Sequence, residues 1–233
     1  MPQKRSKRYE AAAKLVDKRK VYSFSEAVKL LKTVPATKAD QTVDLAFKLG
    51  VDPKQSDQMV RGTVALPMGS GKNVRVLVFA KGAAAEAAKA AGAEFVGFED
   101  LIKRVTEGFQ DFDVAVATTE AMGEVRKLGR VLGPRGLMPN PKTGTVTDDT
   151  AKAVKECKAG RVEFKLDKAA NLHVPVGKFS FPIESLEANG RAVIETIIRS
   201  RPPAAKGRFI ENVTLSSTYS PGIRIDITPF LSA

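Results

Sequence analysis

The sequence predicts an α/β protein in two parts, because its ends and its middle carry different hydrophobic patterns. Near both ends, apolar and polar residues alternate one by one, as in strands with one buried and one exposed face. In the middle, short and nearly continuous apolar runs alternate with helical segments, which is typical of a parallel sheet covered by helices. The 233 residues are enough for one large domain or two small ones.

The first alternating region predicts a helix followed by two strands. Ser23 and Glu26 have the spacing of a capping box, and apolar residues at helical spacing follow as far as Pro35, which ends the helix. Residues 42–49 alternate strictly, with apolar side chains at the odd positions, and residues 60–66 form a second alternating set.

The middle region predicts βαβ units. Strands are expected at residues 74–80, 94–97 and 113–117. Helices are expected at residues 83–91, 99–107 and 148–158.

The two-residue alternation returns after Gly160. Strands 162–166 and 172–176 are separated by a short turn, so we expect them to pair with each other. A helix and two further strands are expected at residues 183–198, 213–219 and 223–227. The simplest topology is one discontinuous α+β domain with an antiparallel sheet and an inserted α/β domain, although the pattern alone also permits two sequential domains.

The charge of the chain indicates a polyanionic partner. There are 38 basic and 26 acidic residues, a net charge of +12, and the pI is about 9.8. Lysine and arginine gain free energy by releasing counterions from a phosphate backbone. Residues 1–20 hold eight of the cations, so they predict either an arm that becomes ordered on nucleic acid or a solvated helix face. The alternative for the whole chain is a basic protein without such a partner.

Several function classes lack the residues that they need. A single histidine, His173, and a single cysteine, Cys157, cannot build a His/Cys zinc site or an internal disulfide. No nucleophile motif lies near His173, and Met68–Asn73 lacks the glycine and the hydroxyl of a P-loop. No apolar run approaches the roughly 20 residues that span a bilayer. We therefore expect no catalytic residue, metal or cofactor, no membrane partner, and a cytoplasmic protein.

Residues 128–146, LGRVLGPRGLMPNPKTGTV, form an unusual segment with four glycines, three prolines, three basic residues and no acid. Such a run cannot be a continuous helix or a central strand, so it predicts a long cationic loop. Its cations Arg130, Arg135 and Lys142 could contact phosphate, or the glycines and prolines could only shape the loop. A GxGxxG dinucleotide motif is absent from it.

The same segment resembles the signature of the bacterial-type ribosomal protein L1 family. Further blocks with a similar order and spacing are Asp52–Thr63, Phe112–Ala117, Ala159–Phe164 and His173–Lys178. The resemblance favours the inserted arrangement, with domain I at residues 1–67 and 160–233 and a Rossmann-like domain II at residues 68–159. It implies hinges near Pro67 and Gly160.

The resemblance also implies partners. The expected protein is a structural component of the large ribosomal subunit, in which domain I binds the 23S rRNA and forms the mobile stalk. It would assist release of deacylated tRNA from the exit site and repress translation by binding its own operon mRNA.

Polar side chains spaced by two residues on a sheet can hydrogen-bond RNA phosphates, 2′-hydroxyls and base edges. Lys165, His173 and the polar positions of 212–218 are such a set, and Thr42 belongs to a similar one; β-propensity alone also explains each threonine. The resemblance places rRNA contacts on Glu26, Lys38, Thr42, Arg161, Lys165, His173, Ser216 and Thr218. The chain departs from the family at Ala39, where many members have Phe, and at Tyr219-Ser220, which replaces Met-Gly. Tyr219 could stack on a base instead.

Two rival functions are compatible with the fold. A small-molecule enzyme would need acid or base groups at the carboxyl ends of the middle strands, where Ala80-Lys81 and Thr118-Thr119 offer little. A general nucleic-acid-binding protein outside the ribosome would show no preference for a folded stalk RNA over random duplex.

Overall fold

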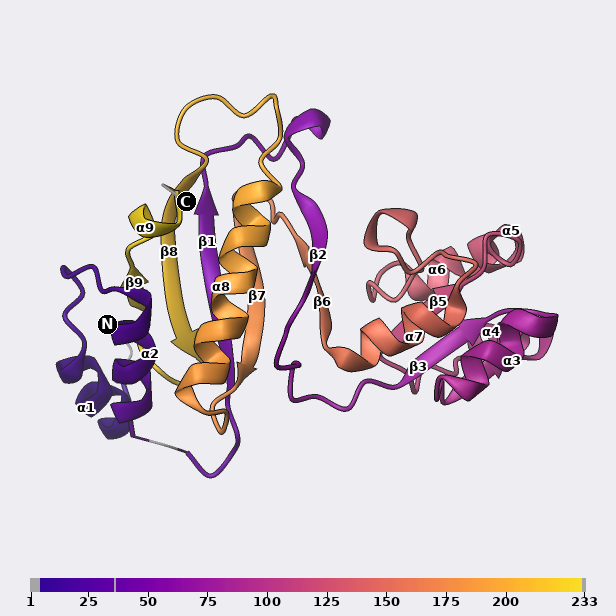
Figure 1. Cartoon of the computed structure of the whole chain (residues 1–233), viewed down its shortest axis with the longest axis horizontal. Coiled ribbons are helices and arrows are strands. Elements are labelled where there is room, and N and C mark those ends of the chain that lie inside the picture. The colour runs from indigo at the N-terminus through magenta and orange to yellow at the C-terminus, as the bar shows by residue number, and fades with distance from the viewer. Residues whose placement is uncertain (1–4, 36, 232–233) are drawn as a thin grey trace. The chain divides into compact units, whose positions relative to one another are not determined.

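The computed structural model describes residues 5–35 and 37–231, except for the side chain of Lys142. The chain forms two compact units (Figure 1). The outer unit consists of Met1–Gly71 and Val162–Ala233, and the inserted unit is Lys72–Arg161. The prediction of a mixed α/β protein is confirmed.

The outer unit is built on a four-stranded antiparallel sheet. In spatial order its strands are β7 (Asn171–Lys178), β1 (Thr42–Leu49), β8 (Ile210–Ser217) and β9 (Ile223–Ile225). The predicted alternation of β1 is confirmed, since Val43, Leu45, Phe47 and Leu49 are all buried. These side chains therefore define the face of the sheet that meets the core.

Helices α2 (Phe24–Thr33) and α8 (Ile183–Arg199) cover this apolar face (Figure 1). Their buried residues, such as Leu31 and Ile194, join one hydrophobic cluster with the sheet. The capping box at the start of α2 is confirmed: the Ser23 hydroxyl accepts from the N–H of Glu26, and the Glu26 carboxylate accepts from the N–H of Ser23. The sheet is thus covered on one side by a layer of helices.

The expected pairing of strands 162–166 and 172–176 is wrong. Strand β6 (Arg161–Lys165) pairs with β2 (Arg61–Ala65) in a separate two-stranded sheet, whereas β7 pairs with β1. The turn between β6 and β7 is closed by a hydrogen bond from the Asp167 N–H to the Asn171 carbonyl. Alternation shows which face of a strand is buried, but it does not specify the neighbouring strand.

The segment after β2 is a turn held by a buried amide. Asn189 on α8 is fully buried, and its side chain accepts from the Met68 N–H and donates to the carbonyls of Gly69 and Val176. This amide fastens the turn and β7 to the same helix. The glycines after Met68 therefore shape a turn, as expected once a P-loop is excluded.

The inserted unit contains a three-stranded parallel sheet in the order β4 (Phe95–Gly97), β3 (Val76–Phe79), β5 (Val114–Ala117). Its longer helices are α3 (Gly82–Ala90), α4 (Glu99–Thr106) and α7 (Thr150–Ala159). Leu77 and Phe79 face one hydrophobic cluster while Val76 and Val78 face another. Both faces of the sheet are therefore buried, which explains why its strands read as continuous apolar runs.

The signature segment is not a loop throughout. Within or at the edge of it, short helical turns occupy Arg126–Leu128, α6 (Gly129–Leu132) and Pro141–Thr143, and α5 (Met122–Val125) lies just before it. Leu128 and Leu132 are buried in the core of the inserted unit, and this burial stabilises helix through Gly129 despite its entropy cost. The irregular part begins at Gly133.

The N-terminal region also contains a helix, α1 (Lys7–Leu15), capped by the Ser6 hydroxyl. Of the two predictions for residues 1–20, this helix corresponds to the solvated helix face. Lys4, another cation of this region, lies outside the described residues. The last helix is the short α9 (Thr228–Leu231). Across the part of the chain that the structure describes, every helix is too short or too polar to cross a membrane.

Gly190 is expected to be essential for the close packing of α8 on α2. A Cβ at this position would overlap the ring of Phe24. We expect Gly190→Ala to destabilise the outer unit by about 1–3 kcal/mol through overpacking, partly offset by the better helix propensity of alanine. Denaturant unfolding monitored by circular dichroism measures this change.

Gly123 in α5 provides the matched control, because a Cβ there would meet open space. Gly123→Ala should leave the stability unchanged or raise it by up to about 1 kcal/mol. Equal effects of the two substitutions would contradict the packing explanation.

Candidate nucleic-acid interface

The face of the four-stranded sheet opposite α2 and α8 is polar. On β1 it carries Thr42, Asp44, Ala46 and Lys48, which are half-buried or exposed. The strand register places polar or charged residues beside them: Ser216 opposite Asp44, Thr214 and His173 opposite Ala46, Asn212 and Asn171 opposite Lys48, and Arg224 opposite Thr214. We call this surface the polar sheet face. It offers hydroxyls, amides and cations at regular spacing.

Three side chains come together at the end of the polar sheet face where β1 begins. The Thr218 N–H donates to the Thr42 carbonyl (3.1 Å), and the Thr42 N–H donates to the Thr218 hydroxyl (3.3 Å). The Lys178 ammonium donates to the Thr42 hydroxyl (3.4 Å). We call Thr42, Lys178 and Thr218 the hydroxyl cluster. Its backbone hydrogen bonds fix the threonines in position.

Lys178 was missed by the sequence analysis for a geometric reason. Its even number places it with Leu172, Val174 and Val176 on the apolar face, if β7 alternates without interruption. Instead the register shifts between Val43 and Asp44, so β7 contains an extra residue and Lys178 lies opposite Thr42. A bulge of this kind moves every later side chain to the other face.

Gln41 was missed as well, and it supports the hydroxyl cluster from inside. Its side chain is buried, and its Oε1 accepts from the Ser217 hydroxyl (2.8 Å) and from the Tyr219 N–H (3.0 Å). Its backbone carbonyl accepts from the Phe179 N–H (2.7 Å). Gln41 therefore links the start of β1 to the ends of β7 and β8. A glutamine just before a predicted strand gives no signal of this role.

His173 and Lys165 occupy different sheets. The exposed His173 lies in the middle row of the polar sheet face. Near it, the pKa of Asp167 is held below its usual value, mainly by the backbone N–H of Asn171 and further by the charge of His173. Lys165 on β6 is exposed and lines a hollow with Pro53 and Met59. The two residues are thus not on paired strands.

Arg161 belongs to a third cluster, in the inserted unit. Its guanidinium forms an ion pair with Glu156 (2.6 Å). The same guanidinium lies where a Cβ of Gly144 would be, and Gly144 has a φ of +64°. Only glycine combines this conformation with so close an approach. One glycine of the signature segment therefore has a structural role beside Arg161.

The other predicted residues are dispersed. Glu26 is exposed on the helical layer, where its carboxylate serves the capping box. Lys38 is exposed in the segment before β1. Arg130 and Arg135 are exposed in the inserted unit, and within residues 5–35 and 37–231 no ion pair involves them. The side chain of Lys142 lies outside the description.

Tyr219 follows the hydroxyl cluster and has a neighbour that the sequence analysis did not connect with it. The residue is 49% exposed. The guanidinium of Arg8, on α1, lies over this ring at 5.2 Å from its centroid. The basic N-terminal helix therefore reaches the same end of the sheet.

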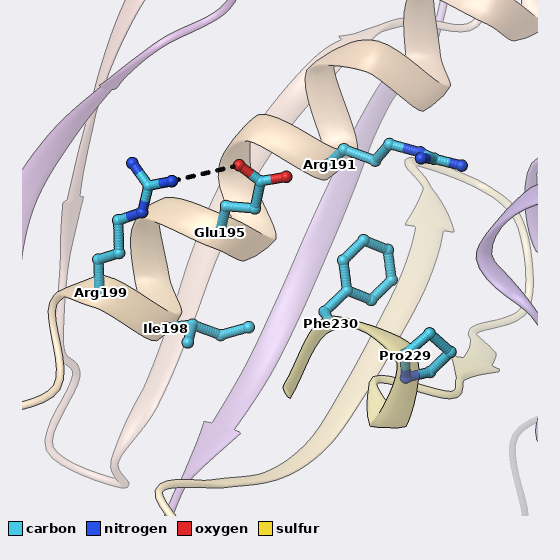
Figure 2. Close-up of a pocket in the computed structure, with 6 residues that line it drawn as sticks. All are labelled: Arg191, Glu195, Ile198, Arg199, Pro229 and Phe230. Carbon is cyan, nitrogen blue, oxygen red and sulfur yellow. Dashed lines mark ion pairs between the residues drawn. The ribbon is translucent and has the colours of Figure 1, made fainter. Parts of the chain in front are cut away.

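A different hollow lies on the helical side of the outer unit, between α8 and α9. Figure 2 shows Arg191, Glu195 and Arg199 along α8, and Phe230 and Pro229 on or beside α9. Arg199 pairs with Glu195 at 3.8 Å. This surface faces away from the polar sheet face, so its side chains can serve as controls.

The described residues contain no cluster of three or more His, Cys, Asp or Glu side chains that could hold a metal ion. The buried thiol of Cys157 has a raised pKa because burial disfavours its charged form.

Comparison with protein families gives one finding. A sequence model described as the ribosomal protein L1p/L10e family matches residues 30–221. The match spans most of the chain, including the inserted unit and the hydroxyl cluster. It leaves out α1 at one end and Arg224 at the other.

Gln41→Leu tests the support beneath the hydroxyl cluster. Leucine has a similar volume but cannot accept the hydrogen bonds from Ser217 and Tyr219, which leaves the buried Ser217 hydroxyl and the partly buried Tyr219 N–H without this acceptor. We expect a loss of about 1–3 kcal/mol in unfolding free energy, measured by denaturant titration. Gln41→Glu retains the acceptor and should keep more of the stability near neutral pH. Equal stability of wild type and Gln41→Leu would show that these bonds contribute nothing.

Proposed function

The chain belongs to the ribosomal protein L1p/L10e family, and we propose that its outer unit binds ribosomal RNA through the polar sheet face and the hydroxyl cluster. Membership makes it a structural, RNA-binding protein of the ribosome and not a member of an enzyme family.

The observation that carries the proposal is the geometry of the hydroxyl cluster. A backbone hydrogen bond from Thr218 to Thr42, and a second from the Thr42 N–H to the Thr218 hydroxyl, hold the two residues together at the end of the sheet, and a cation lies beside them. Hydroxyls and an ammonium in fixed positions can bond to a phosphate or a 2′-hydroxyl with little loss of side-chain entropy. Sequence-specific contacts to exposed base edges can use the same groups.

Side chains on the polar sheet face, beyond the hydroxyl cluster, offer further contacts to RNA. Ser216, Thr214, Asn212 and the ring of His173 offer hydrogen-bonding groups, and Lys48 and Arg224 offer cations. The net charge of +12 favours association with a polyanion throughout. A folded RNA laid across the sheet would meet donors on all four strands.

We also propose rRNA contacts, apart from the polar sheet face, at the remaining residues that the family resemblance implies. These are Glu26, Lys38, Arg161, Lys165 and Tyr219. The exposed Arg130 and Arg135 are a candidate secondary RNA surface in the inserted unit, together with Lys142.

The finer functions are those that the family resemblance implies. We propose that the RNA is the 23S rRNA of the large-subunit stalk and that the protein assists release of deacylated tRNA from the exit site. We further propose that it represses translation by binding a similar structure in its own operon mRNA. These roles place it on the cytoplasmic ribosome.

Loss of one hydroxyl from the cluster should weaken RNA binding. We expect Thr218→Ala and Thr42→Ala each to reduce the affinity for a stalk rRNA fragment about 5- to 10-fold, which corresponds to one hydrogen bond of about 1–1.5 kcal/mol. Titrations at several salt concentrations measure this, and the affinity of every variant should fall steeply as salt rises.

Thr196→Ala is the matched control. It removes the same hydroxyl from α8, on the helical layer, where it bonds only to the Ala192 carbonyl among the described groups. Its affinity should equal that of the wild type. The site assignment would fail if Arg130→Gln/Arg135→Gln abolished binding while both cluster variants bound normally. Equal affinity for random duplex RNA would overturn the proposed stalk specificity.

A further inference from the structure

Helix α1 is anchored to the outer unit by its apolar side. Ala12 is 1% exposed, and Val16, just after the helix, belongs to the main hydrophobic cluster of this unit. The backbone N–H of Asp17 also donates to the Tyr22 hydroxyl (3.2 Å). These contacts hold the polar side of α1 in a defined position.

The start of α1, with the two residues before it, and the segment after β8 border a shallow, open hollow. It is lined by Arg5, Ser6, Arg8, Tyr9, Thr218, Tyr219 and Ser220. Arg8 lies over the Tyr219 ring, and Arg5 lies over the Tyr9 ring at 4.9 Å from its centroid. The hollow therefore combines two guanidinium groups with two aromatic rings, next to a hydroxyl of the cluster.

The charge of the two arginines is not balanced locally. No ion pair within the described residues includes Arg5 or Arg8, and the only acid within α1 is Glu10. A guanidinium over an aromatic ring keeps its full charge and its edge donors available to an anion. The hollow thus favours a ligand that carries negative charge.

The backbone of Tyr219 is held in place from below. Its N–H donates to the buried Gln41, and the N–H of the preceding Thr218 donates to Thr42. A tyrosine on such a fixed backbone offers a large flat surface at small cost in conformational entropy. This surface suits a planar partner.

We propose that this hollow binds one unpaired nucleotide of the RNA, with its base stacked on Tyr219 and its phosphate held by Arg5 and Arg8. The inference rests on the proposed function, because the nucleotide belongs to the RNA that lies on the polar sheet face. It adds α1, which lies outside the residues that match the family, to the interface. A base within a duplex is already stacked on both sides, so the hollow selects an unpaired nucleotide.

A tryptophan at position 219 reports directly on stacking. The chain contains no tryptophan, so Tyr219→Trp places its single tryptophan in the hollow, where it can be excited selectively. We expect the stalk rRNA fragment to quench its emission on binding. A fully paired duplex of the same length should quench it much less, and a glutamate-rich peptide should not quench it.

Affinity measurements with four variants complete the test. Tyr219→Ala should weaken binding of the stalk fragment about 5- to 150-fold, the range expected for loss of one base–aromatic stack, and Tyr219→Phe should bind within about twofold of the wild type. Arg8→Gln should weaken binding about 3- to 10-fold and lower the slope of log affinity against log salt by about one phosphate contact. Arg191→Gln removes an exposed arginine from the hollow of Figure 2 and should affect neither quantity to this extent.

The outcomes separate this inference from the proposed function. Tight, stalk-specific binding with no quenching, and with Tyr219→Ala equal to wild type, overturns the nucleotide hollow and leaves the sheet interface intact. Strong quenching by single-stranded RNA without any preference for the stalk supports the hollow and overturns the stalk function. Quenching by the acidic peptide as strong as that by RNA overturns the nucleotide as occupant. Melting curves establish that each variant is folded.

Discussion

The burial of alternate side chains beneath α2 and α8 is the constraint on which the outer unit depends. Because successive side chains of a strand point to opposite faces, filling the core with Val43, Leu45 and Phe47 forces their neighbours outward. The polar sheet face is a direct consequence of this packing. A shift of one residue in register would move these apolar side chains into solvent, so the core also fixes which polar groups share a row.

The end of the sheet obeys a second, local constraint. The extra residue in β7 brings Lys178 onto the polar side, and Gln41 joins the strand ends from within the core. Both features act on the same point, where Thr42 and Thr218 meet. A binding surface built from short side chains needs such support, because a hydroxyl positions a ligand only when its own backbone is fixed.

The cationic groups of the chain divide into several surfaces rather than one. Arg161 is engaged with Glu156 and packed at Gly144, and Arg199 pairs with Glu195 on the helical layer. In contrast, Arg5 and Arg8 face aromatic rings. The net charge therefore indicates that the chain binds an anionic molecule. Whether a given cation can contact that molecule depends on the groups that it already contacts within the chain.

The sequence by itself determined the fold class, the capping box of α2, the buried faces of β1 and of the inserted sheet, and the family. The fold class, the capping box and the buried faces follow from periodicity and local spacing, which a single segment carries, whereas the family rests on the resemblance of several sequence motifs. Only the tertiary structure decided the partner strands of β6 and β7, the helical start of the signature segment at Gly129, and the neighbours of Thr42 and Tyr219. Each of these depends on contacts between residues far apart in the chain, and the hydrophobic pattern of one segment does not specify which distant segment it meets.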